Sequence, residues 1–244
     1  MRQIRGYIDT PLTPGAIVVL DERLGHHLTR VLRLETDAPV VLFNGDGFDY
    51  HAVLLGGGRR QLEARVDSRE PGIADSPLAL TLAQGLCRGE KMDLILQKAT
   101  ELGVAAFQPL STERSEVRLS GEREAKRMAH WRQVIVSACE QCARSRVPTL
   151  SQPMPMAQWI GDRALLDSTR LMLDPTAQSS IVEVKITSPV VLAVGPEGGF
   201  SPNEREMLVR AGFLGARLGP RILRTETAGF AAISVLQALS GDLR

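Results

Sequence analysis

The sequence predicts an α/β fold, in which a mainly parallel sheet with helices follows a small β-rich domain. From about residue 78 onward, short and almost continuously apolar runs alternate along the chain with amphipathic helical patterns. That order is typical of parallel strands connected by crossover helices. Before about residue 70, short strand-like runs are joined by tight turns that contain glycine and aspartate, which is typical of a small barrel.

The predicted barrel contains strand-like runs at AIVVL (residues 16–20) and PVVLF (residues 39–43). The turn NGDG leads from the second run into FDYHAVLL (residues 48–55), and we expect a hairpin there because glycine supplies the positive φ that a tight turn needs. One amphipathic helix is expected over residues 21–34. The segment SREPGIADSP (residues 68–77) lacks apolar periodicity, which predicts a linker.

We therefore predict a barrel at residues 1–70, a linker at 71–77 and an α/β domain at 78–244. Within the α/β domain, four apolar runs predict buried strands: LALTLAQGL (78–86), VAAFQPL (104–110), RLMLD (170–174) and VVLAV (190–194). Helical patterns cover residues 89–103, about 122–143 and about 227–239. Gly103 follows the first of these helices at the C′ position, where glycine commonly ends a helix.

The composition is that of an ordinary globular protein, with 43% hydrophobic and 23% charged residues among 244. No apolar run is long enough to span a bilayer and the first residues do not resemble a secretory signal, so we expect a cytoplasmic location. A net charge of +1 neither announces nor excludes a nucleic-acid partner, and an aromatic content of 4% argues against a stacking platform for single strands.

Three cysteines form no disulfide framework. Cys139 and Cys142 make a single C-x-x-C inside a predicted helix, without a second pair or a nearby histidine. Such a pattern favours buried structural thiols over a zinc or redox site. We therefore predict that the protein binds no metal.

The stretch VVLAVGPEGGFSPNERE (residues 190–206) joins a strand to a helix through a Gly-rich turn. Ser201 is expected at the N-cap with Pro202 at N1, and Glu204 at N3 completes a capping box. The turn would then lie beyond the carboxyl end of a strand, where α/β proteins bind ligands. The alternative to a ligand-binding turn is a purely structural turn, in which the glycines serve only the backbone geometry.

The sequence GPEGG matches neither common phosphate loop, because it lacks the Lys and Ser/Thr of one and the glycine spacing of the other. Glu197 would also repel a phosphate from the backbone amides of the turn. The pattern therefore favours a ligand that is cationic or neutral where it meets this turn.

A second turn lies in LGPRILRTETAGFAAI (residues 218–233), which opens the last predicted helix. Two Gly-rich turns in one α/β domain, each followed by a helix, could enclose a flat ligand. Taken alone, Arg224 and Glu226 are better interpreted as an ion pair at the helix start, where the helix dipole favours the carboxylate.

Together, VGPEGGFS and LGPRILRTETA resemble the signature of the SPOUT methyltransferases. The chain is most similar to the ribosomal small-subunit methyltransferase E family, which methylates N3 of a uridine in 16S ribosomal RNA. Four further stretches carry the resemblance: HHLTRVLRL (26–34), RGEKMDLILQKATELGV (88–104), PLSTERSEVRL (109–119) and ACEQCARSRVP (138–148). Gly229 and Phe230 replace the apolar pair that is more usual after TETA.

The resemblance implies an N-terminal PUA-like barrel and a C-terminal SPOUT domain with a deep trefoil knot. It also implies a homodimer that binds S-adenosyl-L-methionine in the knot loops, with the active site at the subunit interface. The implied cofactor-binding residues are Leu173, Gly195, Glu197, Gly198, Gly199, Leu218, Gly219, Ile222, Leu223 and Thr225.

Methylation at N3 requires that uracil lose its N3 proton, and the resulting anion spreads onto O2 and O4. A cation near these oxygens would lower the pKa of N3 and stabilise the developing charge. Arg224 is the first candidate and Arg114 the second, with Glu226 as a carboxylate that orients either one. The motifs that contain Arg114, Arg224 and Glu226 include no histidine, so we do not expect a histidine base. His26 and His27 lie on the predicted N-terminal helix, where we expect them to contact RNA or solvent.

The expected substrate is 16S ribosomal RNA or the small ribosomal subunit. Basic residues near the matching motifs are candidate phosphate contacts: Arg30, Arg33, Arg88, Lys91, Arg144 and Arg146. Two other functions stay open at this stage. One is an RNA-binding ribosome-assembly factor without turnover, and the other is a Rossmann-type nucleotide enzyme, whose fingerprint glycines the chain lacks.

Overall fold

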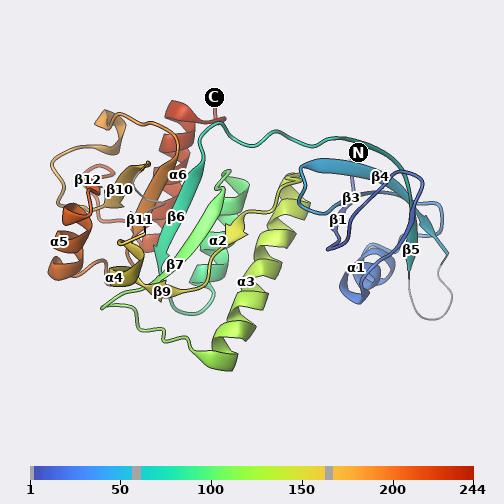
Figure 1. The fold of residues 1–244 in the computed structure, drawn as a ribbon, viewed down its shortest axis with the longest axis horizontal. Helices are drawn as coiled ribbons and strands as arrows, with labels where there is room; N and C mark the ends of the chain where they lie inside the picture. Colours follow the sequence, from blue (N-terminus) through green and yellow to red (C-terminus); the bar gives the residue numbers. More distant parts are fainter. Residues whose placement is uncertain (1–2, 57–61, 163–166) are drawn as a thin grey trace. The chain divides into compact units, whose positions relative to one another are not determined.

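The computed structural model describes residues 3–56, 62–162 and 167–244. The chain forms two compact units (Figure 1). Unit 1 consists of Met1–Asp75 together with Val136–Val147, and unit 2 consists of Ser76–Ile135 together with Pro148–Arg244. Residues 136–147 therefore belong by their contacts to the N-terminal unit, an association that no linear division of the chain anticipates.

Unit 1 contains a five-stranded sheet of barrel-like character. Its strands, in spatial order, are β1 (Arg5–Tyr7), β3 (Pro39–Phe43), β4 (Phe48–Leu55), β5 (Glu63–Pro71) and β2 (Ile17–Val19). β1 pairs with β3 in parallel, and the other pairs are antiparallel. The predicted hairpin between β3 and β4 is confirmed, and Gly45 and Gly47 in its turn have φ values of 94° and 95°.

The helix of unit 1 packs against this sheet and contributes to its hydrophobic core. α1 (Glu22–His26) starts at Asp21, whose side chain accepts a hydrogen bond from Leu24 N, and it continues as a π-helical turn, η1 (His27–Val31). Leu24 and Leu28 are buried with Leu42, Leu54 and other strand residues in one hydrophobic core. The expected helix over residues 21–34 thus ends three residues early.

β5 extends further than the sequence predicted. The segment at residues 68–77, expected to be linker throughout, is strand as far as Pro71. The reason is cross-strand pairing, because Asp49 lies opposite Glu70 and Phe48 opposite Pro71. The long strand β4 supplies hydrogen-bond partners that apolar periodicity within the segment does not reveal.

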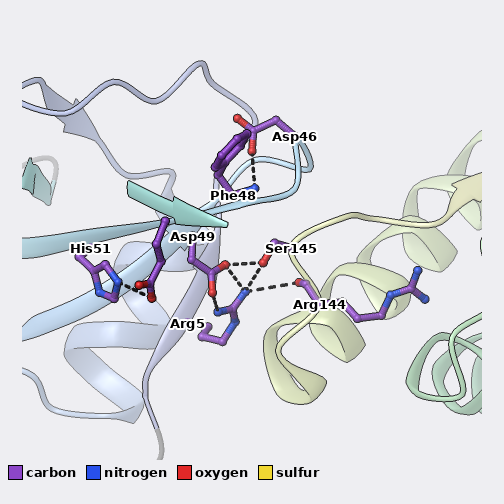
Figure 2. A network of polar contacts seen from close by, with 8 residues as sticks. Arg5, Asp46, Phe48, Asp49, His51, Arg144 and Ser145 are labelled. Carbon is purple, nitrogen blue, oxygen red and sulfur yellow. Dashed lines mark hydrogen bonds and ion pairs between the residues drawn. The ribbon is translucent and has the colours of Figure 1, made fainter. Parts of the chain in front are cut away.

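A buried ion pair connects the sheet of unit 1 to residues 136–147 (Figure 2). Arg5 on β1 donates two hydrogen bonds to the Asp49 carboxylate on β4, at 2.5 and 2.8 Å. The Ser145 hydroxyl donates to the same carboxylate, and Arg5 also donates to Ser145 Oγ at 3.0 Å. Because the Arg5 side chain is 4% exposed and Asp49 13%, each charge depends on the other for compensation.

Glu140 makes a second connection of the same kind. Its Oε1 accepts a hydrogen bond from Tyr7 N at 3.0 Å and forms an ion pair with Arg23 at 3.1 Å. The last residues of α3 (Gly121–Cys142) are therefore held by β1 and by the start of α1.

Unit 2 is a seven-stranded sheet whose pairings are all parallel among the described residues. The order is β12 (Leu214–Ala216), β10 (Thr169–Leu173), β11 (Val190–Val194), β6 (Leu80–Gly85), β7 (Ala106–Ser111) and β8 (Thr149–Leu150), and β9 (Met154–Pro155) also pairs with β7. All five residues of β11 are buried, as expected for a central strand covered on both faces. The predicted mainly parallel α/β sheet is confirmed.

Helices pack on the sheet of unit 2. α2 (Lys91–Glu101) packs on α6 (Thr225–Ser240), which also contacts β11. α4 (Met156–Trp159) and α5 (Pro202–Arg210) share a hydrophobic cluster with β10 and β11 that includes Trp159, Leu208 and Val191. Gly103, with φ of 84°, follows α2 at the predicted C′ position. The deep knot implied by the resemblance stays a prediction.

We expect Asp49→Ala to lower the free energy of unfolding by about 3–5 kcal/mol at pH 7, because Arg5 would remain buried without a counter-charge. Burial raises the pKa of Asp49, but hydrogen bonds from Arg5 and Ser145 and the charge of Arg5 outweigh it and hold the pKa below 3.8. The contribution of the carboxylate is therefore complete above pH 3.8 and is lost as the pH falls through the lowered pKa.

Denaturant unfolding between pH 7 and pH 3 measures the free energy of unfolding of the wild type and of Asp49→Ala. The difference in this free energy between the two proteins should become smaller toward pH 3. Asp67→Ala is the control, because Asp67 forms an exposed pair with Arg65 on the same strand and should change stability little. If the difference in the free energy of unfolding between wild type and Asp49→Ala stayed the same down to pH 3, the ionised Asp49 carboxylate would not be the source of the stabilisation.

Candidate functional site

A pocket of about 300 Å³ opens at the carboxyl ends of β10, β11 and β12. This is the edge of a parallel sheet where ligands of α/β proteins bind. Its walls are the turn at residues 195–200 after β11, residues 173–175 after β10, residues 216–223 after β12, and Thr225 and Ala228 of α6. The volume is at the lower end of the range typical of small-molecule sites.

All ten residues predicted to bind the cofactor line this one pocket: Leu173, Gly195, Glu197, Gly198, Gly199, Leu218, Gly219, Ile222, Leu223 and Thr225. Arg114 also lines it. The structure therefore brings together segments that are separated by more than fifty residues in the sequence. Arg224 and Glu226 do not line the pocket; Arg224 is exposed at the N-cap of α6 and Glu226 lies in the first turn of that helix.

The Gly-rich turn has the local structure that its sequence predicts. Ser201 caps α5, and its side chain and that of Glu204 form the expected capping box. The chain folds back so closely that a methyl group on Gly195 would lie 2.8 Å from Phe200 N, and Gly199 has φ of 65°. Glycine is required at both positions because a side chain would clash or strain the backbone.

Gln84, near the end of β6, connects two of the segments that line the pocket, the turn after β11 and the start of α6. Its side-chain nitrogen lies 3.2 Å from both Gly195 O and Thr225 Oγ1, and Thr225 Oγ1 donates to Gly195 O at 2.6 Å. Gln84 is 1% exposed, so these bonds form without competition from water. They join the turn after β11 to the start of α6.

The Glu197 carboxylate has partners within the protein. Its carboxylate accepts a hydrogen bond from Arg88 N at 3.1 Å and forms an ion pair with Lys91 at 3.2 Å. Burial raises the pKa of Glu197, but hydrogen bonds from its own N–H and that of Arg88, together with Lys91, hold the pKa below its ordinary value. Glu197 thus ties the Gly-rich turn to the start of α2.

Arg114 lies on the other side of the Gly-rich turn. It follows β7, and its Nη1 donates to Gly198 O at 2.8 Å. Gly198 leaves room for this approach, since an added methyl group would lie 3.1 Å from Arg114 Cβ.

The predicted RNA contacts fall in both units. In unit 2, Arg88 pairs with Glu116 and Lys91 with Glu197. In unit 1, Arg144 and Arg146 both form ion pairs with Asp75. Arg30 and Arg33 are exposed at the end of the π-helical turn, and Arg33 has a positive φ of 54°.

Cys87 and Cys139 are buried, as expected of structural thiols, whereas Cys142 is only half-buried. Burial raises the pKa of Cys139 to about 12, and burial with the charge of Glu197 does the same for Cys87. Within the described ranges, no group of three or more His, Cys, Asp or Glu side chains has the geometry of a metal site. None of the described helices is long and apolar enough to cross a membrane.

Two family models match the chain. An RNA methyltransferase domain matches residues 74–237, and an RNA methyltransferase PUA domain matches residues 20–67. The ribosomal RNA small subunit methyltransferase E of Buchnera aphidicola is 34% identical, over 98% of this chain and 97% of its own length. The chain belongs to the ribosomal RNA small subunit methyltransferase E family.

Solved structures agree with this family assignment. A methyltransferase of Legionella pneumophila, solved with bound S-adenosylmethionine, is 40% identical with a TM-score of 0.95. A small subunit methyltransferase E of Neisseria gonorrhoeae, solved with the same cofactor, is 35% identical with a TM-score of 0.92. In both comparisons the match covers the whole of each chain.

Sequence reasoning missed several residues in or next to this pocket. Gln84 carried a weak signal, since it is a polar residue at the end of an apolar strand. Asp174, Arg205, Arg217 and Arg221 line the pocket itself, but no local pattern distinguishes them from solvated surface charges.

We expect Thr225→Val to weaken S-adenosylmethionine binding about tenfold and to lower the free energy of unfolding by about 1–3 kcal/mol, because it removes a buried donor to Gly195 O and an acceptor for Gln84. Thr225→Ser keeps the hydroxyl and should retain both properties. Calorimetric titration with the cofactor and thermal unfolding measure them. If Thr225→Val and Thr225→Ser had equal cofactor affinity and equal thermal stability, the Thr225 hydroxyl would not be needed to maintain the pocket.

Proposed function

We propose that this protein transfers the methyl group of S-adenosyl-L-methionine to N3 of a specific uridine in 16S ribosomal RNA. The observation that carries the proposal is that every residue expected to bind the cofactor lines the same pocket at the carboxyl edge of the sheet. Relatives that match over their full length were solved with that cofactor bound. Family membership argues against a Rossmann-type nucleotide enzyme.

The residues of the pocket fit this cofactor. Gly195, Gly198 and Gly199 expose backbone groups to the pocket, while Leu218 and Ile222 offer apolar surface for a flat ring. Glu197 is ionised and held by Lys91, so it would not disfavour a ligand with positive charge. When bound, S-adenosylmethionine supplies a methyl group on an electrophilic sulfonium.

The role of this chain is then to position uracil and to stabilise its N3 anion. Arg224 follows Leu223 and precedes Thr225, both of which line the pocket, and its side chain is exposed at the N-cap of α6. Arg114 lines the pocket itself. We assign Arg224 as the first and Arg114 as the second cation for the uracil oxygens, with Glu226 as the carboxylate that orients them.

RNA binding is assigned to the barrel domain, residues 1–70, with Arg30 and Arg33, and to Arg88, Lys91, Arg144 and Arg146.

A homodimer is also part of the proposal. Ile222 is 87% exposed although it lines the pocket, which supports a second subunit covering this edge. Light scattering of the purified protein measures the assembly. We place the activity in the cytoplasm, where small ribosomal subunits are its substrate.

We expect Arg224→Ala to lower the rate of methyl transfer by about 100-fold or more, the usual effect of removing one group that stabilises transition-state charge. Cofactor affinity should change little, because the side chain does not line the pocket. Transfer of radioactive methyl groups to small subunits that lack the modification, together with calorimetric titration, measures the two quantities. Arg210→Ala is the matched control, since Arg210 is an exposed arginine paired with Glu206 on α5.

An Arg224→Ala variant that transfers methyl groups at the wild-type rate would refute its catalytic role. The function as a whole is tested by mass mapping of modified nucleosides in small-subunit RNA from cells with and without this protein. Loss of one N3-methyluridine supports the proposal. RNA binding without any methyl transfer in a single-turnover assay would instead support the assembly-factor alternative.

A further inference from the structure

Glu204 on α5 is a buried carboxylate whose place in the capping box accounts for only one of the two hydrogen bonds that its oxygens accept. It is 3% exposed, and within the described part of the chain it forms no ion pair. Its two oxygens instead accept hydrogen bonds from backbone N–H groups of two different segments, Ser201 N and Glu113 N, each at 2.8 Å. Burying a charge is costly unless hydrogen bonds compensate it, so both bonds matter.

Only one of these two bonds belongs to the helix cap. The capping box needs the bond from Ser201 N to Glu204 Oε2 and the return bond from Glu204 N to Ser201 Oγ. The bond from Glu113 N reaches a residue 91 positions away in the sequence. Glu204 therefore connects the start of α5 to the loop that follows β7.

That loop carries Arg114. It is closed by a bond from Ser115 N to Thr112 O at 3.2 Å and by a hydroxyl contact between the same two residues at 2.8 Å. Arg114 projects from it and donates to Gly198 O at 2.8 Å. The loop is thus fastened at Glu113 to the helix that follows the Gly-rich turn, and at Arg114 to the turn itself.

We propose that Glu204 is a positioning residue for methyl transfer, which holds Arg114 over the pocket by fixing Glu113 N. This rests on the proposed function, in which Arg114 acts on the uracil oxygens. A carboxylate is needed because both of its partners are N–H donors. A glutamine would direct its own NH₂ group at one of them and leave that N–H without an acceptor.

The test is a double-mutant cycle of Glu204→Gln with Arg114→Ala, measured on the full chain by single-turnover methyl transfer to unmodified small subunits and by calorimetric titration with the cofactor. We expect Glu204→Gln to lower the transfer rate about tenfold with less than about a threefold change in cofactor affinity. In the Arg114→Ala background it should lower the rate no further, because coupled residues are non-additive.

Ser201→Ala is the matched control, since it removes the return bond of the capping box and the contact between the Ser201 hydroxyl and the Glu113 carboxylate, but leaves the bond from Glu113 N to Glu204 in place. It should lower the melting temperature and retain the transfer rate. The positioning role is overturned if Ser201→Ala loses as much transfer rate as Glu204→Gln. It is also overturned if Glu204→Gln lowers the transfer rate by the same factor in the Arg114→Ala background as in the wild type.

A second pair of variants leaves Glu204 in place and keeps the proposal testable if Glu204→Gln does not fold. Glu113 is exposed, and Glu113→Pro removes its backbone N–H, whereas Glu113→Ala keeps it. We expect the proline variant alone to lose about tenfold in rate, and equal rates would refute the proposal. Absence of methyl transfer by the wild-type protein would count against the proposed function instead, so the two failures are distinguishable.

Discussion

The pocket depends on how closely the ends of β6 and β11 approach each other. A methyl group on Gly85 would lie 2.5 Å from Pro196 Cδ and 2.6 Å from Pro196 N, so only glycine allows this contact. The approach brings Gln84 within hydrogen-bond distance of Gly195 O and Thr225 Oγ1. One buried side chain on a central strand therefore connects the turn after β11 to the start of α6, and both of these segments line the pocket.

The parts of the fold that were predicted correctly are those whose cause is local. β3, β4 and β11 occupy the predicted residues, and Ser201 caps α5 as its capping box requires. Apolar runs, turn glycines and caps act within a few residues, so they are visible in the sequence. The residues of the pocket were found for a different reason, the resemblance of two motifs to a known family.

The features that were missed arise from partners distant in the sequence. β5 extends to Pro71 because β4 pairs with it, and β12 is three residues long, too short for a periodic pattern. Residues 136–147 associate with unit 1 through Arg5, Asp49 and Glu140. Glu204 was predicted as part of a capping box, but its bond to Glu113 joins α5 to the loop after β7, and no local pattern relates these two segments.

The acidic residues that line the pocket explain what kind of chemistry the site supports. Glu197 is engaged by Arg88 N and Lys91. Asp174 accepts two hydrogen bonds from Thr176 and lies 3.8 Å from an Arg205 nitrogen. Neither carboxylate is placed as a free general base.

Cations and backbone groups dominate the remaining polar surface. Arg114 is aimed across the Gly-rich turn, and Arg221 is exposed at the rim. A site of this composition favours a reaction in which the acceptor nitrogen becomes nucleophilic because its anion is stabilised, rather than because a strong base is supplied. If the arginines act as proposed, the geometry of the loops that carry them determines the rate, and a buried carboxylate such as Glu204 would contribute by holding backbone N–H groups in place, at a distance from the reacting atoms.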